Sequence, residues 1–289
     1  MFRINSQDEI VRALLSLLFI SVITQIAEAE KPSPIEAIEY RGGIRNSTGQ
    51  YRLERKQQEI LLAGLREKTG FAELDFAESG YLKIGNQNNF AGGSSAARKL
   101  LVAATASPIL FNLENHNHSS EVSFARLAKS IIYRNMITKA EIEVRPLVID
   151  FSDYSQLLGD KDVMRSFDVA ITVLHELVHG VYRLQDAVDD SNEIGECENL
   201  VNTIRRDLGL PERQSYLARL SGSNPRPGFL TRRAELQFLR TKEKDGRLKT
   251  EREILSWDAV KVGLVMADDK SLLSAKSNRK GLKTTAAIH

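Results

Sequence analysis

The sequence predicts an α+β fold in which a small mixed sheet, with an edge strand, lies beside a buried helix and a second, glutamate-bearing helix. Residues 167–179 are apolar almost throughout, which is typical of a helix buried on all sides. Residues 143–151 have the composition of a strand, and Pro146 favours an edge position because proline cannot donate to a sheet ladder. Residues 192–207 read as a helix that ends before Gly209 and Pro211.

Composition limits the classes of function. The 289 residues suit one large or two small domains. The net charge is +2, from 40 basic and 38 acidic residues, which is too balanced to indicate a nucleic-acid partner. The single cysteine, Cys197, excludes an internal disulfide and a cysteine-rich zinc ribbon, so we expect any metal to bind through nitrogen and oxygen.

The N-terminus resembles a secretory signal peptide. An apolar run at residues 13–27 is too short for a confident membrane span, and a small-x-small site at residues 27–29 follows it. We therefore predict a signal peptide at residues 1–29, a secreted or periplasmic protein, and no stable membrane span after cleavage. The acidic Asp8 and Glu9 leave a second interpretation open: an amphipathic first helix of a cytoplasmic protein.

The rest of the chain divides into three predicted parts. Residues 30–50 are rich in proline and glycine and read as a linker, residues 51–267 as a single domain, and residues 268–289 as a flexible basic tail. Within the domain, helices are expected at residues 51–67 and from residue 96, where Ser94 or Ser95 can cap the N-terminus. Residues 159–162 are expected to begin the buried helix, and Asp245-Gly246 to turn a hairpin.

The motif that carries chemistry is His-Glu-Leu-Val-His at residues 175–179. Side chains four residues apart share one helix face, so His175 and His179 can hold one zinc ion. Glu176 is then placed to act as general base on water, which predicts metal-assisted hydrolysis, most often of a peptide bond. The alternative is a buried helix whose histidines are satisfied by backbone or carboxylate partners.

Catalytic zinc takes three protein ligands and keeps one position open. The class with a third histidine six residues past the second is excluded, because that position is Gln185. A carboxylate is the remaining source, and we favour Glu196 on the second helix, then Glu198, then Glu193. The full set of acidic candidates is Asp186, Asp189, Asp190, Glu193, Glu196 and Glu198.

These residues resemble the zincin metallopeptidases of the gluzincin type. Residues 196–216 are similar to bacterial effector-type zinc metallopeptidases, which carry Asn-x-x-Arg-x-x-Leu-Gly-x-Pro-x-Arg-x-x-Tyr after the ligand glutamate, and the resemblance covers about residues 145–216. It implies a zincin-like fold and one Zn²⁺ per chain, held by His175, His179 and Glu196, with Glu176 as general base. Many members have alanine where this chain has Cys197.

The expected function is a zinc metallopeptidase that acts on a protein or peptide. Tyr216 either donates to the oxyanion or is a packed aromatic residue. Two alternatives stay open: a non-catalytic protein whose fold is closed by the metal, and a metal-dependent amidase acting on cell-wall peptide.

Overall fold

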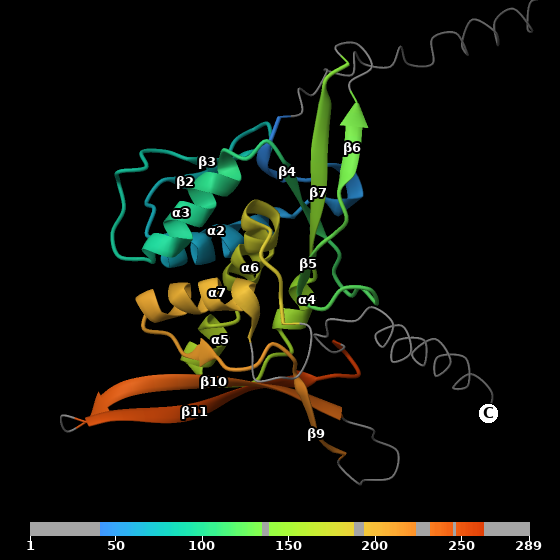
Figure 1. Cartoon of the computed structure of the whole chain (residues 1–289). Coiled ribbons are helices and arrows are strands. Elements are labelled where there is room, and N and C mark those ends of the chain that lie inside the picture. Colours follow the sequence, from blue (N-terminus) through green and yellow to red (C-terminus); the bar gives the residue numbers. More distant parts are fainter. Residues whose placement is uncertain (1–40, 135–138, 188–193, 224–231, 245–246, 263–289) are drawn as a thin grey trace, which may run out of the picture. The chain divides into compact units, whose positions relative to one another are not determined.

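Runs of strands and runs of helices follow one another along the chain in a mixed α+β arrangement with small sheets (Figure 1). The computed structural model describes residues 41–134, 139–187, 194–223, 232–244 and 247–262. The predicted signal peptide and basic tail lie outside these residues. In chain order the elements are β1 (Gly43–Asn46), η1 (Gly49–Tyr51), α2 (Arg55–Thr69), β2 (Leu74–Phe76), β3 (Leu82–Ile84), α3 (Ser95–Thr105), β4 (Leu110–Asn115), β5 (Ala125–Leu127), β6 (Ile131–Arg134), β7 (Glu141–Ile149), α4 (Phe151–Tyr154), α5 (Lys161–Arg165), α6 (Val169–Tyr182), α7 (Gly195–Asp207), β8 (Glu212–Arg213), β9 (Arg219–Ser223), β10 (Arg232–Lys244) and β11 (Arg247–Asp258).

The main sheet is small and mixed, as predicted. Its strand order is β1-β4-β7-β5, and β6 also pairs with β7. Strands β1, β4 and β7 are parallel, whereas β5 and β6 run antiparallel to β7. Strand β1 falls inside the predicted linker, because a four-residue strand with two polar side chains gives little sequence signal; all of its residues are buried.

The edge strand is not the one predicted. Strand β7 pairs on both sides, since Leu147 lies opposite Leu113 of β4 and Leu127 of β5. Pro146 is tolerated there because it faces the interval between β5 and β6, where its carbonyl accepts a hydrogen bond from Ala128 N. Within the described residues, β5 and β6 form one edge of this sheet and β1 lies at the other.

Helix α6 is the buried helix that the apolar run predicts. It contacts α2, α3, α7 and β5, and Leu174, Leu177 and Val178 are fully buried (Figure 1). It begins at Val169, where the Asp168 carboxylate accepts a hydrogen bond from Ile171 N. The predicted start at residues 159–162 is wrong: these residues lead into the separate short helix α5.

The C-terminal end of α6 is fixed by a close contact. A Cβ on Gly180 would lie 2.2 Å from Phe111 Cε1, so only glycine lets the helix approach β4 this closely. The helix ends at Tyr182, and Arg183 turns the chain with φ of 56°.

A second sheet, of order β11-β10-β8 with β9 paired to β10, contains the predicted hairpin. Its turn, residues 245–246, lies outside the described residues, but the register that pairs Leu236 with Leu255 is that of a hairpin. Trp257 packs edge-on against Phe124 and parallel to Phe167, which attaches the hairpin to the segment before α6. Among the described residues, no helix is both long and apolar enough to cross a membrane.

Candidate metal centre

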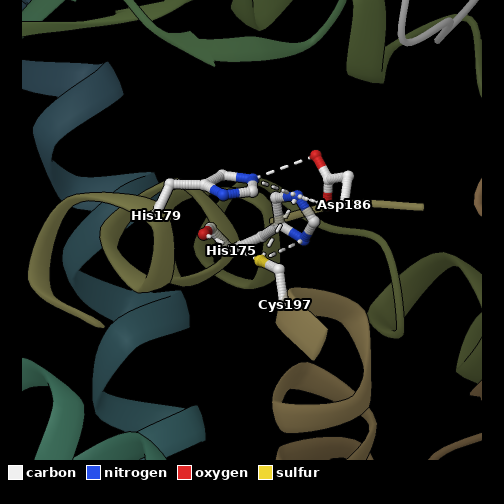
Figure 2. A group of neighbouring side chains, drawn as sticks. All are labelled: His175, His179, Asp186 and Cys197. Carbon is white, nitrogen blue, oxygen red and sulfur yellow. Dashed lines mark hydrogen bonds and ion pairs between the residues drawn. The ribbon is translucent and has the colours of Figure 1, made fainter. Parts of the chain in front are cut away.

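Helix α6 aims its two histidines at one point. The ring centroids of His175 and His179 are 4.8 Å apart with the planes at 81°, and their Nε2 atoms are 3.1 Å apart (Figure 2). Two imidazole nitrogens this close need a shared proton or a shared cation between them. Both histidines therefore face one site.

Asp186 completes the group from the segment that follows α6. Its Oδ1 lies 3.2 Å from His175 Nε2, and its Oδ2 lies 3.0 Å from His179 Nε2. The turn at Arg183 sends the chain back over the helix end, so the carboxylate faces both rings (Figure 2). Asp186 was one of the acidic candidates in the sequence, but it was not among those favoured.

A glycine brings the second helix to this site. Gly195 forms a bridge with Asp186, and Cys197 N donates to Gln185 O at 3.2 Å. Gly195 has φ of +75°, and a Cβ on it would lie 2.4 Å from Ala187 N. Because only glycine permits both the conformation and the contact, Gly195 positions Asp186 beside the start of α7.

Cys197 is the fourth member of the group. Its side chain is fully buried, and its Sγ lies 3.6 Å from His175 Nδ1 and 3.7 Å from His175 Nε2. Possible ligand atoms of His175, His179, Asp186 and Cys197 all lie within 4.8 Å of one another (Figure 2). The sequence predicted nitrogen and oxygen donors alone, and the structure adds sulfur.

The donor set fits a metal ion. Four donors bound tetrahedrally at ~2.0–2.3 Å lie about 3.3–3.7 Å from one another. The distances between His175 Nε2 and its neighbours are 3.1 Å to His179 Nε2, 3.2 Å to Asp186 Oδ1 and 3.7 Å to Cys197 Sγ. Asp186 Oδ1 is buried and, despite its 3.2 Å approach to His175, receives no well-aligned hydrogen bond. A cation would satisfy it, so this group can hold a metal ion.

The outer nitrogens of both rings are occupied by acceptors. His179 Nδ1 is 2.6 Å from Leu184 O; a carbonyl only accepts, so Nδ1 donates and Nε2 carries the lone pair of the neutral ring. His175 Nδ1 lies 3.2 Å from Glu198 Oε2, which has the same effect. Acceptors on the outer nitrogens are the usual arrangement around metal-ligating histidines.

In the metal-free protein, ion pairs hold His175, His179 and Asp186 together. Burial alone would lower the pKa of His179, but hydrogen bonds to Asp186 and Cys197 raise it to about 10. Burial would also lower the pKa of His175, but the close approach of Asp186, Cys197 and Glu198 raises it. Burial would raise the pKa of Asp186, whereas the two histidines hold it well below its ordinary range.

Glu176 lies between the two histidines in sequence and beside the edge strand in space. Its Oε2 accepts a hydrogen bond from Leu127 N of β5 at 2.7 Å. Burial raises the pKa of Glu176, while the charges of His175 and His179 oppose that rise. A carboxylate with a raised pKa is better suited to accept a proton near neutral pH.

The favoured third ligand, Glu196, is not brought to the site. Its side chain is exposed, and it is not part of the donor group. Successive residues on a helix point about 100° apart, so the turn that directs Cys197 and Glu198 inward directs Glu196 outward. The second choice, Glu198, is fully buried and lies against His175, whereas Glu193 lies outside the described residues.

Tyr216 lies beside the centre. Its ring stacks on that of His175, with centroids 6.1 Å apart and planes at 14°. The guanidinium carbon of Arg213 lies 5.0 Å from the centroid of the Tyr216 ring. Burial, followed by the negative charge of Asp186, raises the pKa of Tyr216 above its ordinary value. The position of Tyr216 suits both a donor to the oxyanion and a packed aromatic residue.

Comparison with known proteins gives no relative: no family model matches the chain, and neither a curated protein nor a solved structure is significantly similar to it.

Proposed function

We propose that this protein is a zinc-dependent hydrolase that cleaves peptide bonds. The observation that carries the proposal is the convergence of His175, His179 and Asp186 on one point, with the half-buried Glu176 on the same helix held by Leu127 N. A metal ion that only stabilised the fold would not require Glu176, a further ionisable side chain, beside its ligands. The two-histidine, one-carboxylate donor set is the one typical of zinc peptidases.

Zinc bound by this group would supply a Lewis acid that polarises a carbonyl and makes water more acidic. Glu176 accepts the proton of the attacking water and delivers it to the leaving amine, which its raised pKa favours. The contacts from Leu184 and Glu198 keep the His179 and His175 rings oriented throughout. Tyr216 contributes a phenol beside His175 that can donate to the oxyanion.

The edge strand supports an extended substrate. Leu127 N points away from β7, because it donates to Glu176 rather than to the sheet. A peptide that added to this edge of β5 would therefore pass Glu176. This geometry favours a protein or peptide substrate.

The test is Glu176→Gln, which keeps the shape of the side chain and removes its basicity. It should retain bound zinc and lose turnover of a casein-like substrate by about 10²–10⁴-fold. Glu59→Gln, an exposed change on α2, is the matched control and should leave turnover unchanged. Undiminished hydrolysis by Glu176→Gln, with the metal still bound, would remove Glu176 from the mechanism.

One observation favours a second candidate, a non-catalytic metal centre. Cys197 supplies a fourth protein donor, and structural zinc sites are closed by four such donors. A metal content of one per chain, with no cleavage of a mixed protein panel by any variant, would support it. Peptidoglycan fragments belong in the same panel, since an amidase acting on cell-wall peptide would use the same groups.

A further inference from the structure

The sulfur of Cys197 lies within reach of the donor group, since one ligand atom of each of His175, His179, Asp186 and Cys197 lies within 4.8 Å of the others. In a tetrahedral site a nitrogen at ~2.05 Å and a sulfur at ~2.3 Å from the ion lie about 3.6 Å apart. Cys197 Sγ lies 3.7 Å from His175 Nε2 and 3.6 Å from His175 Nδ1, so the thiol contacts the whole ring and a small side-chain rotation would turn it toward an ion held at Nε2. The 3.1 Å and 3.0 Å separations of His179 Nε2 from His175 Nε2 and Asp186 Oδ2 are close to the other edges.

Cys197 belongs to the buried core, and the polar contacts of its side chain go to His175. The backbone contact of Sγ is to His175 O at 3.6 Å, which is a weak thiol hydrogen bond. The side chain is fully buried and points toward the two histidines and Asp186 rather than into the apolar core alone (Figure 2). The backbone of the same residue is fixed by its hydrogen bond to Gln185 O, next to Asp186.

We propose that Cys197 is a fourth metal ligand and that it closes the site, so that the arrangement in this structure is a latent form of the hydrolase. Four protein donors leave no position for water or a substrate carbonyl. Hydrolysis then requires Cys197 to leave the metal, while His175, His179 and Asp186 remain. The ligand assignment stands on the donor geometry, whereas the latency rests on the function proposed above.

The test replaces zinc by Co²⁺, whose bond to a thiolate gives a strong near-ultraviolet absorption that nitrogen and oxygen donors do not give. Metal-free wild type titrated with Co²⁺ should show this absorption, with one Co²⁺ per chain. Cys197→Ser and Cys197→Ala should lose it. Both should also bind Co²⁺ more weakly, by at least the 10–100-fold that loss of an outer-shell partner costs. Glu196→Gln changes the exposed neighbour on the same helix and should keep the absorption.

Turnover separates this inference from the proposed function. If Cys197 closes an active site, Cys197→Ala should hydrolyse a casein-like substrate several-fold faster per bound metal than wild type. A thiolate absorption in wild type with no hydrolysis by either protein would keep the ligand assignment and overturn the latency together with the peptidase. Bound Co²⁺ without the absorption would overturn the ligand assignment, and hydrolysis by that protein would still support the peptidase. The absorption is measured on wild type, so the assignment remains falsifiable even if a variant fails to fold.

Discussion

Glu198 Oε2 lies 3.2 Å from His175 Nδ1, so a wholly buried carboxylate holds the outer nitrogen of a candidate metal ligand. The same carboxylate pairs with the buried guanidinium groups of Arg205 and Arg213. Burial alone would raise the pKa of Glu198, but the two arginines lower it well below its ordinary value. Arg205 within α7 and Arg213 in β8 thus act on the candidate metal centre through Glu198.

Replacing Glu198 with glutamine should therefore weaken both the fold and the centre. Two buried arginines lose their counter-charge, which costs about 3–5 kcal/mol of the free energy of unfolding. Zinc affinity should fall 10–100-fold, because His175 loses the partner that orients it. Urea unfolding of the metal-free protein and competition with a zinc chelator measure the two effects. Glu196→Gln, two residues away and exposed, should change stability by less than about 0.5 kcal/mol; equal effects of the two changes would refute the positioning role.

Gly195 and Gly209 form a matched pair on either side of α7. Both have positive φ, +75° and +65°, so alanine introduces similar backbone strain at each. Only at Gly195 would the added Cβ collide with the segment that carries Asp186, whereas Gly209 has open space around it. Gly195→Ala should lower zinc affinity far more than Gly209→Ala does, and it should also cost more stability because of the added collision. Similar zinc affinities in the two variants would show that the Asp186 segment does not depend on this contact.

Much of the fold could be predicted from the sequence because it follows from local patterns. The apolar run gave α6, Asp245-Gly246 indicated the hairpin between β10 and β11, and Ser94 caps α3 by accepting from Ala97 N. The edge strand could not be predicted, since β5 is three residues long and its pairing with β7 is a tertiary contact. Pro146 was misleading because a proline only lacks a backbone N–H donor, and this does not show which strand lies at the edge of the sheet.

The same division holds for the candidate metal centre. Side chains four residues apart lie on the same face of any helix, so the convergence of His175 and His179 could be predicted. The other two donors depend on the bridge between Asp186 and Gly195, which joins segments on either side of residues 188–193. Helix periodicity alone indicates that Glu196 points to a different side of the helix from Cys197 and Glu198. What was lacking was knowledge of which face of α7 meets α6.

Asp162 links the helical part of the chain to the hairpin and should produce a measurable acid dependence. It bonds Arg240 at 2.7 Å and Arg165 at 3.0 Å, and the hydrogen bond to Arg240 lowers its pKa below 3.8. A lowered pKa in the folded state means that the stabilisation is present above pH 3.8 and is lost as the pH falls below it. Wild type should exceed Asp162→Asn in stability at pH 6, by no more than about 1 kcal/mol for so exposed a pair, and the difference should vanish in strong acid.

Unfolding measured at several pH values checks this, with Asp160→Asn as control. Asp160 is exposed and precedes the same helix, but its side chain makes no capping hydrogen bond. That variant should follow the wild-type acid dependence. If Asp162→Asn does so too, the bond to Arg240 does not contribute to stability in solution.

Binding of zinc to the metal-free protein should release protons and stabilise the fold. The pKa of about 10 at His179 means that this ring is protonated at pH 7.5 in the metal-free state, and a metal ligand must be neutral. Mixing with Zn²⁺ in weak buffer should therefore acidify the solution, and free zinc at about 100 times its Kd should add about 2.7 kcal/mol to the free energy of unfolding. Asp186→Asn should diminish both responses, because it removes a donor and the charge that raises the pKa of His179. Identical melting curves with zinc and with chelator, and no proton release, would mean that His175, His179 and Asp186 form a buried ion-pair cluster and not a metal centre.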